Sequence, residues 1–229
     1  MAIDRADSQP PRSAAAAVQV AVLAKAPIPG LAKTRLIPAL GARGAARLQR
    51  RLTRAALQTA REAAVGPVTL WCAPDARHRF FRALQRNSEL RCVVQASGDL
   101  GCRMHTAFRL HCTEGPLLLI GTDCPAMRPA HLREAAQALL DGADAVFQPA
   151  EDGGYVLVGL RQPQAALFAD MPWSTDRVMA ETRVRASSSG LRVCELETLW
   201  DVDTPDDLVR LRAFGADSRG AGPWATIPR

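Results

Sequence analysis

Cationic side chains gather in one loop close to the start of the chain. The loop reads Ala24-Lys25-Ala26-Pro27-Ile28-Pro29-Gly30-Leu31-Ala32-Lys33-Thr34-Arg35-Leu36. It contains the only two lysines of the sequence, whereas the other 27 of the 29 basic residues are arginines. Lysine offers a compact positive charge and arginine a planar fork that matches phosphate oxygens. A stiff loop that carries Lys25, Lys33 and Arg35 around Pro29 and Gly30 is therefore typical of a phosphate-binding site.

Carboxylates follow two apolar segments later in the chain. Asp123 stands in Gly-Thr-Asp-Cys-Pro directly after the apolar run 117–120, and Asp203 stands two residues after Asp201. In open α/β sheets, ligands collect outside the carboxyl ends of the strands. A hard divalent cation that holds a diphosphate takes one or two carboxylates, with water and phosphate oxygens completing its shell. Asp123 and Asp203 are therefore the predicted ligands for Mg²⁺ or Mn²⁺. The alternative for Asp123 is a plain turn role. For Asp201 two alternatives stay open, a supporting role at the metal site or a position in solvent.

The loop Glu151-Asp152-Gly153-Gly154-Tyr155 carries the only tyrosine of the chain. Gly153 and Gly154 would let a ligand or another backbone segment approach closely. Asp152 could orient a sugar hydroxyl or complete the metal shell. The alternative is an ordinary tight hairpin turn.

Two weaker candidates lie in other loops. Asp99 stands in Ser-Gly-Asp-Leu-Gly and Trp173 in Pro-Trp-Ser-Thr. Asp99 is also a suitable helix cap, and a tryptophan is more often part of a core than of a base-stacking site.

The elements that must position these side chains alternate between strands and helices. The expected strands are 18–23, 68–72, 92–95, 117–120, 145–148, 155–160 and 191–196. The expected helices are 41–64, 75–86, 98–112, 129–141, 175–186 (capped by Ser174 or Thr175) and one that begins with Thr204-Pro205. Such alternation favours a three-layer α/β/α fold around a doubly wound sheet. The short return at 149–154 makes the sheet mixed, although mostly parallel.

The length of 229 residues suits a single domain at 16–214, with a disordered tail at 1–15 and a loose tail at 215–229. The sequence contains no run of about 18 apolar residues, so no membrane span is expected. Six scattered cysteines without metal-ligand spacing indicate free thiols and a cytoplasmic location. The net charge of +6 is most simply arginine on solvent faces, because aromatic residues at 5% give no sign of nucleic-acid binding. An exposed edge strand would permit a homodimer.

Six ordered motifs resemble a bacterial family of GT-A superfamily transferases, described as radical-SAM/selenodomain-associated or arsenosugar-biosynthesis glycosyltransferases. The motifs are the loop 24–36, Gly98-Asp-Leu-Gly101, Gly121-Thr-Asp-Cys-Pro125, Glu151-Asp-Gly-Gly-Tyr155, Pro172-Trp-Ser-Thr175 and Asp201-Val-Asp-Thr-Pro-Asp-Asp-Leu208. The resemblance spans residues 18–212 and implies a nucleotide-diphospho-sugar transferase fold. It also implies that Asp123 and Asp203 hold the catalytic metal and that the basic loop lies near the nucleotide phosphates. Cys102 departs from the family pattern, because an acidic residue is expected there.

We therefore expect a metal-dependent transferase that uses a nucleotide-activated donor, with a small-molecule acceptor. Glycosyl transfer is favoured over nucleotidyl transfer with pyrophosphate release, because the first loop lacks the Gly-x-Gly-x-Arg pattern of pyrophosphorylases. A non-catalytic nucleotide-binding protein is the alternative from another class. The expected catalytic residues are Asp123 and Asp152, and Asp123 and Asp203 are the expected metal ligands. The expected substrate- and nucleotide-binding residues are Lys25, Pro29, Gly30, Lys33, Arg35, Asp99, Gly153, Gly154, Tyr155 and Trp173.

Overall fold

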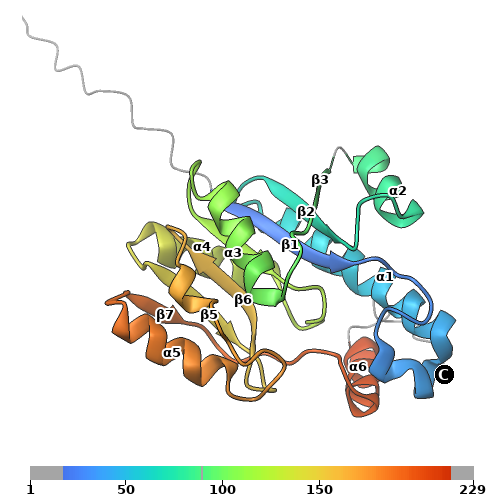
Figure 1. Ribbon diagram of the computed structural model, residues 1–229. Coiled ribbons are helices and arrows are strands. Elements are labelled where there is room, and N and C mark those ends of the chain that lie inside the picture. The colour runs from blue at the N-terminus through green and yellow to red at the C-terminus, as the bar shows by residue number, and fades with distance from the viewer. Residues whose placement is uncertain (1–17, 89, 218–229) are drawn as a thin grey trace, which may run out of the picture.

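The computed structural model describes residues 18–88 and 90–217, which form one sheet covered by helices on both faces (Figure 1). The seven strands of this part are β1 (Gln19–Lys25), β2 (Val68–Ala73), β3 (Arg91–Val94), β4 (Leu117–Ile120), β5 (Ala145–Pro149), β6 (Tyr155–Leu160) and β7 (Val193–Glu195). Their order across the sheet is β3-β2-β1-β4-β6-β5-β7. β6 runs antiparallel to β4 and β5, and the other neighbours are parallel. The predicted mixed, mostly parallel sheet is confirmed.

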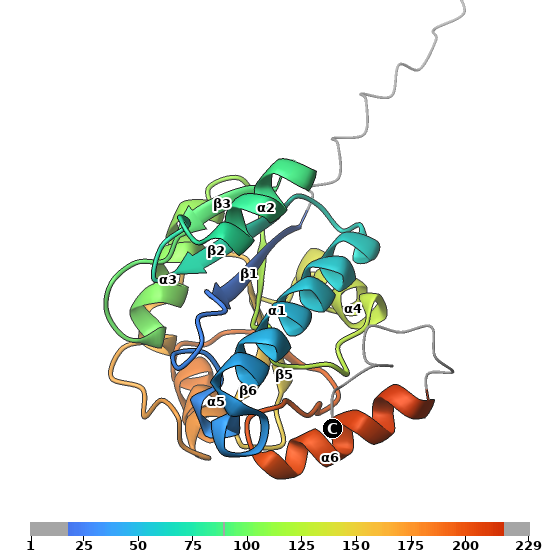
Figure 2. The ribbon, with the colours of Figure 1, turned by 90° about the vertical axis from the view of Figure 1, so that its right-hand side faces the viewer.

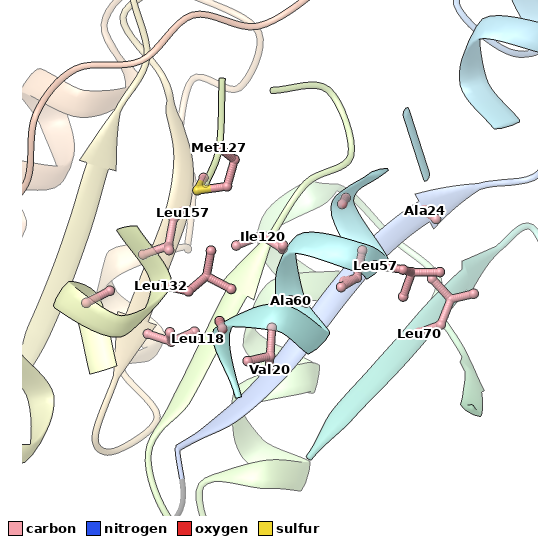
Figure 3. Packing of buried hydrophobic residues seen from close by; sticks show 14 of the residues in the cluster. Val20, Ala24, Leu57, Ala60, Leu70, Leu118, Ile120, Met127, Leu132 and Leu157 are labelled. Carbon is pink, nitrogen blue, oxygen red and sulfur yellow. The ribbon is translucent and has the colours of Figure 1, made fainter. Parts of the chain in front are cut away.

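Helices cover the two faces of the sheet in separate sets. The helices are α1 (Ile37–Ala63), α2 (Arg79–Ser88), α3 (Leu100–His111), α4 (Pro129–Leu140), α5 (Val178–Ser188) and α6 (Pro205–Asp217), with short 3-10 turns η1 (Thr34–Leu36) and η2 (Ala165–Leu167). One apolar cluster joins α1, α2 and α4 to the sheet, and a second joins α3 and α5 to its other face. Figure 3 shows the first cluster, in which Leu57 of α1 and Leu132 of α4 lie against strand residues such as Ile120. The structure therefore has the predicted three layers.

A third apolar cluster brings the end of the described chain back to its beginning. Leu208 of α6, together with Trp200 and Val202, packs with Leu36 and Leu52. Figure 2 shows α6 lying beside the first part of α1. The segment 199–208 is thereby held next to the loop that precedes α1.

Several helix starts differ from the prediction because local side chains form turns there. Asp75 accepts a hydrogen bond from the Arg77 amide at 2.7 Å, so a turn occupies the predicted first residues of α2. Thr175 Oγ1 donates to the Pro172 carbonyl at 2.7 Å, and α5 begins three residues later than expected. Ser174 has φ 63 and does not cap a helix, since Arg177 occupies the N-cap.

α6 continues through Asp217, so residues 215–217 are helical rather than part of a loose tail. The predicted tail at 1–15 and residues 218–229 lie outside the described residues. Among the described helices, none combines the length and the apolar character needed to cross a bilayer.

Candidate functional site

A cavity of about 570 Å³ lies at the carboxyl ends of β1 and β4. At this point the chain departs in opposite directions across the sheet, since it crosses from β1 to β2 on one side and from β4 through α4 to β5 on the other. Such a switch point is where open α/β sheets bind ligands. The predicted residues that line the cavity are Lys25, Lys33, Arg35, Asp123, Asp152, Gly154, Tyr155, Trp173 and Asp203. The predicted residues outside its lining are Pro29, Gly30, Asp99 and Gly153.

The first loop turns sharply as soon as β1 ends. The Ile28 amide donates to the Ala26 carbonyl at 2.8 Å, and the Leu31 amide donates to the Ile28 carbonyl at 3.0 Å. Gly30 adopts φ 86, which favours glycine, and it is exposed. Pro29 is also exposed, so both residues shape the loop rather than the cavity wall.

The three cations of this loop occupy different environments. Lys33 is nearly inaccessible, with 4% of its side chain exposed, and its Nζ lies 2.9 Å from Asp123 Oδ2. The same ammonium donates to the Val202 carbonyl at 2.5 Å. Arg35 pairs with Asp203 but keeps 64% of its side chain exposed, and Lys25 is exposed as well. Lys33 thus ties two loops together, while Lys25 and Arg35 are accessible to a ligand.

Asp123 is oriented by groups from three segments. Thr122 Oγ1 donates to Asp123 Oδ1 at 3.0 Å and accepts from Gln49 Nε2 of α1 at 3.0 Å. The Val202 amide donates to the Asp123 carbonyl at 2.9 Å. Gln49 and Thr122 were not among the predicted site residues. A glutamine within the mostly apolar buried stripe of α1 was the signal that could have revealed the first.

Asp201 is a further residue of the cavity that the prediction left open. Burial raises the pKa of its carboxyl to about 6, and the charges of Asp152 and Asp123 act in the same direction. Lys33 opposes this effect. Because Val202 between them is fully buried, Asp201 and Asp203 both line the cavity, as the i, i+2 spacing of an extended segment allows. Four aspartates therefore line one cavity.

The carboxylates would need partners from a ligand in order to hold a metal. Within residues 18–88 and 90–217, no group of three or more His, Cys, Asp or Glu side chains is arranged to hold an ion by itself. Asp123 and Asp203 nevertheless expose 46% and 43% of their side chains to the cavity or solvent. Mg²⁺ is commonly held by one or two carboxylates plus substrate phosphates. The donor set fits such a shared ion and does not fit a closed protein cage.

The loop between β5 and β6 is a tight turn, and its two glycines have different roles. Gly153 adopts φ 86, and a Cβ at that position would lie 2.1 Å from the Asp176 carbonyl oxygen. Gly153 is therefore required for packing against the segment before α5. The Gly154 amide donates to Asp152 Oδ1 at 2.9 Å, which leaves the second oxygen of Asp152 without a described partner at the cavity wall.

Tyr155 and Trp173 form an aromatic wall of the cavity. Their rings meet edge to face with centroids 6.4 Å apart. The Tyr155 Oη and Trp173 Nε1 atoms are buried without a partner among the described residues. Burial raises the pKa of Tyr155, so the phenol stays protonated and can donate a hydrogen bond.

The start of α3 completes the wall opposite the sheet. Asp99 Oδ1 accepts from the Cys102 amide at 2.8 Å, so Asp99 caps the helix and lies outside the cavity lining. A Cβ on Gly101 would lie 2.4 Å from the Phe168 carbonyl oxygen and 3.0 Å from Trp173 Nε1. Gly101 thus allows α3 to approach Trp173, while Arg103 of the same helix reaches the cavity.

The sequence matches the model of a family described as an uncharacterized protein conserved in bacteria (DUF2064) over residues 47–175, which is more than half of the chain. A comparison with curated protein sequences gave no match.

Three solved structures show what the fold is similar to. A protein from Desulfovibrio desulfuricans G20, proposed to be a nucleotide-diphospho-sugar transferase, superposes with a TM-score of 0.82 at 26% identity, covering 92% of this chain and 93% of that chain. CMP:2-keto-3-deoxy-manno-octonic acid synthetase, determined with CTP, has a TM-score of 0.55 at 17% identity, covering 88% and 99%. Rv0371c of Mycobacterium tuberculosis H37Rv, determined with manganese, has a TM-score of 0.53 at 22% identity, covering 84% and 97%. The fold is that of nucleotide-diphospho-sugar transferases and cytidylyltransferases.

Proposed function

This chain belongs to the DUF2064 family, and we propose that it is a metal-dependent transferase that uses a nucleotide-activated donor. The observation that carries the proposal is one cavity lined both by the cations of Lys25 and Arg35 and by the carboxylates of Asp123 and Asp203, with Arg35 paired to Asp203. Positive side chains beside paired carboxylates suit a diphosphate bridged by a divalent ion. The favoured reaction is transfer of a sugar from a nucleotide-diphospho-sugar to a small acceptor.

The proposed roles of the cavity residues follow from the exposure of their side chains. Asp123 and Asp203 would hold Mg²⁺ or Mn²⁺, and a bound ion supplies Lewis-acid stabilisation of a departing phosphate oxygen. The exposed cations Lys25 and Arg35 would bind the phosphates. Lys33, which is buried against Asp123, would position that carboxylate rather than bind the ligand directly.

Asp152 is the proposed acceptor-side or sugar-orienting residue. One of its oxygens accepts from the Gly154 amide, which fixes the carboxylate at the cavity wall. A carboxylate held in this way can accept a hydrogen bond from a sugar or acceptor hydroxyl. Its effect on the pKa of Asp201 supports its proximity to the other aspartates.

Nucleotidyl transfer is the second candidate, because structures with this fold include CMP:2-keto-3-deoxy-manno-octonic acid synthetase determined with CTP. Separate incubations of small-molecule acceptors with a nucleotide sugar or with a nucleoside triphosphate in Mn²⁺, followed by identification of the released phosphate product, separate the two reactions. A released nucleoside diphosphate supports glycosyl transfer, whereas pyrophosphate supports the second candidate. The narrower relation to radical-SAM-associated arsenosugar enzymes stays a prediction.

Metal dependence of nucleotide binding tests the site itself. Calorimetry should show that Mn²⁺ tightens binding of a nucleoside diphosphate about tenfold or more in the wild type, since the ion neutralises phosphate charge beside carboxylates. Asp123→Asn and Asp203→Asn should lose this dependence. Asp206→Asn, an exposed aspartate in the first turn of α6, is the matched control. A wild type that binds nucleotide equally with and without metal would refute the metal role.

A further inference from the structure

Arginines are distributed very unevenly along this chain. Residues 37–88, from the start of α1 to the end of α2, carry ten arginines and two acids and therefore a net charge of +8. The whole chain carries +6, so the remaining residues together are negative by two charges. A general preference for arginine would not produce this separation. It requires a local explanation.

The arginines of α1 and α2 form one surface. Positions 43, 47, 50, 54 and 61 recur at helical spacing, so they follow one side of α1. α2 packs on the same face of the sheet, and the guanidinium groups of Arg50 and Arg54 lie 5.5 and 5.7 Å from the ring centre of its Phe80. Figure 2 shows α1 and α2 on the side of the sheet that faces the viewer. The exposed residues of this basic face are Arg43, Arg47, Arg50, Arg54, Arg61, Arg79, Arg82 and Arg86.

Acidic partners do not neutralise this face. In the part of the chain that the structure describes, none of its eight arginines takes part in an ion pair with a carboxylate. Several arginines elsewhere are paired with carboxylates, for example Arg183 with Glu195 and Arg210 with Glu151. The positive field over α1 and α2 is therefore available to an external anion.

The chemistry of the face indicates what kind of anion it suits. Protein interfaces are built around buried aromatic or aliphatic anchors, yet no large hydrophobic side chain is exposed within the described residues of α1 and α2. Single-stranded nucleic acid requires exposed aromatic rings for stacking, and these helices present none in their described residues. A lipid surface offers a plane of negative headgroups that needs no individual partner residue.

We propose that the basic face, Arg43 to Arg86 on α1 and α2, binds the surface of an anionic lipid bilayer by charge alone. α1 is interrupted at Gly41, which has φ 66 and ψ 162, and its continuous part at 42–63 extends about 33 Å, which allows its arginines to contact many headgroups at once. Because no apolar side chain of these helices enters the bilayer, binding is reversible and falls steeply as salt increases.

Sedimentation with vesicles tests the proposal on the full chain. The wild type should bind vesicles of phosphatidylcholine mixed with phosphatidylglycerol at low salt and should not bind phosphatidylcholine alone. The variant R43Q/R47Q should bind the anionic vesicles about 20-fold more weakly, since each arginine near the surface contributes separately. R82Q/R86Q, on the other helix, should show a similar loss.

The matched control is R109Q/R177Q, which removes the same charge from exposed arginines on the α3 and α5 side of the sheet. It should weaken vesicle binding less than about threefold, because that face points away from the membrane. Equal losses in control and test variants overturn the proposal, as does wild-type binding to neutral vesicles or to none. A short DNA duplex that binds more tightly than anionic vesicles also overturns it and identifies nucleic acid as the partner.

Discussion

The two lysines of the chain, Lys25 and Lys33, perform different tasks although they share one loop. Lys25 is exposed at the cavity, whereas Lys33 is buried and its ammonium contacts both Asp123 and the Val202 carbonyl. Lys33 also adopts φ 48, a left-handed conformation that costs a residue with a side chain roughly 1 kcal/mol. The surrounding contacts must offset that cost. The Lys33 ammonium makes these contacts, with the Asp123 carboxylate and the Val202 carbonyl.

Lys33→Met should lower the free energy of unfolding by about 2 kcal/mol, because the carboxylate of Asp123 and the Val202 carbonyl both lose a charged donor. Lys25→Met is the matched control and should change stability by less than about 0.5 kcal/mol. Urea denaturation of both variants measures the difference. Equal stability of the two variants would show that the Lys33 contacts do not hold the loops together.

Gly153 and Gly30 form a second informative pair, since both adopt φ 86. A Cβ at Gly30 meets nothing within 4 Å, whereas at Gly153 it would overlap the Asp176 carbonyl. Gly30→Ala should therefore cost about 1 kcal/mol, from backbone strain alone. Gly153→Ala should cost about 3 kcal/mol or more, because the turn must also shift away from α5. Thermal unfolding distinguishes them, and equal losses would contradict the packing role of Gly153.

At the scale of elements, the sequence was most informative where burial is simplest. The apolar run 117–120 predicted β4, and the Pro129 and Gly142 boundaries predicted α4. Helix starts were less predictable, because Asp75 and Thr175 form hydrogen-bonded turns that resemble caps in sequence. The site loops followed from the strand ends. The role of Gln49 could not be predicted, because it depends on a contact with Thr122, which lies 73 residues away in the sequence.

One contact between elements is sensitive to pH. His111 at the end of α3 lies with its Nδ1 2.6 Å from Gln19 Oε1 of β1, while Gln19 Nε2 donates to the His111 carbonyl at 2.9 Å. Burial, and secondarily the charge of Arg91, lowers the pKa of His111 below its ordinary 6.5. The unfolded chain therefore takes up a proton first as pH falls, and the folded state loses stability.

Protonation of His111 should consequently cost the wild type stability as pH falls below about 6.5, and His111→Gln should lack this contribution, so that its stability falls less steeply with decreasing pH. Urea denaturation at several pH values measures both slopes. Identical slopes in the two proteins would rule out His111 as the titrating group.

At the scale of the whole molecule, the cavity is assembled from distant parts of the chain. The family match covers residues 47–175, and it includes Asp123 and Asp152. Lys33, Arg35 and Asp203 lie outside the matched segment, yet they line the same cavity. The third apolar cluster is the physical reason, because it fixes Val202 against Leu36. Sequence alone could place each loop at a strand end, but it could not show that the last loop contacts the first.

Ligand binding should stabilise the entire fold, since the cavity joins both ends of the described chain. A nucleoside diphosphate with Mn²⁺, at about 100 times its dissociation constant, contributes roughly 2.7 kcal/mol and should raise the melting temperature by about 5–10 °C. Asp123→Asn should lose the metal-dependent part of this rise. Differential scanning fluorimetry measures the rise in melting temperature. A wild-type melting temperature that stays the same with every nucleotide tested would contradict nucleotide binding.

The contact of Lys33 with the Val202 carbonyl joins residues that are 169 positions apart. A ribosome makes the chain from its N-terminus, so Lys33 emerges long before its partner has been synthesised. Until then the nascent protein has the basic loop without the late aspartates. Under the proposed function, the chain can therefore bind its donor only after residue 203 has been synthesised, and a chain truncated before that residue would lack this ability.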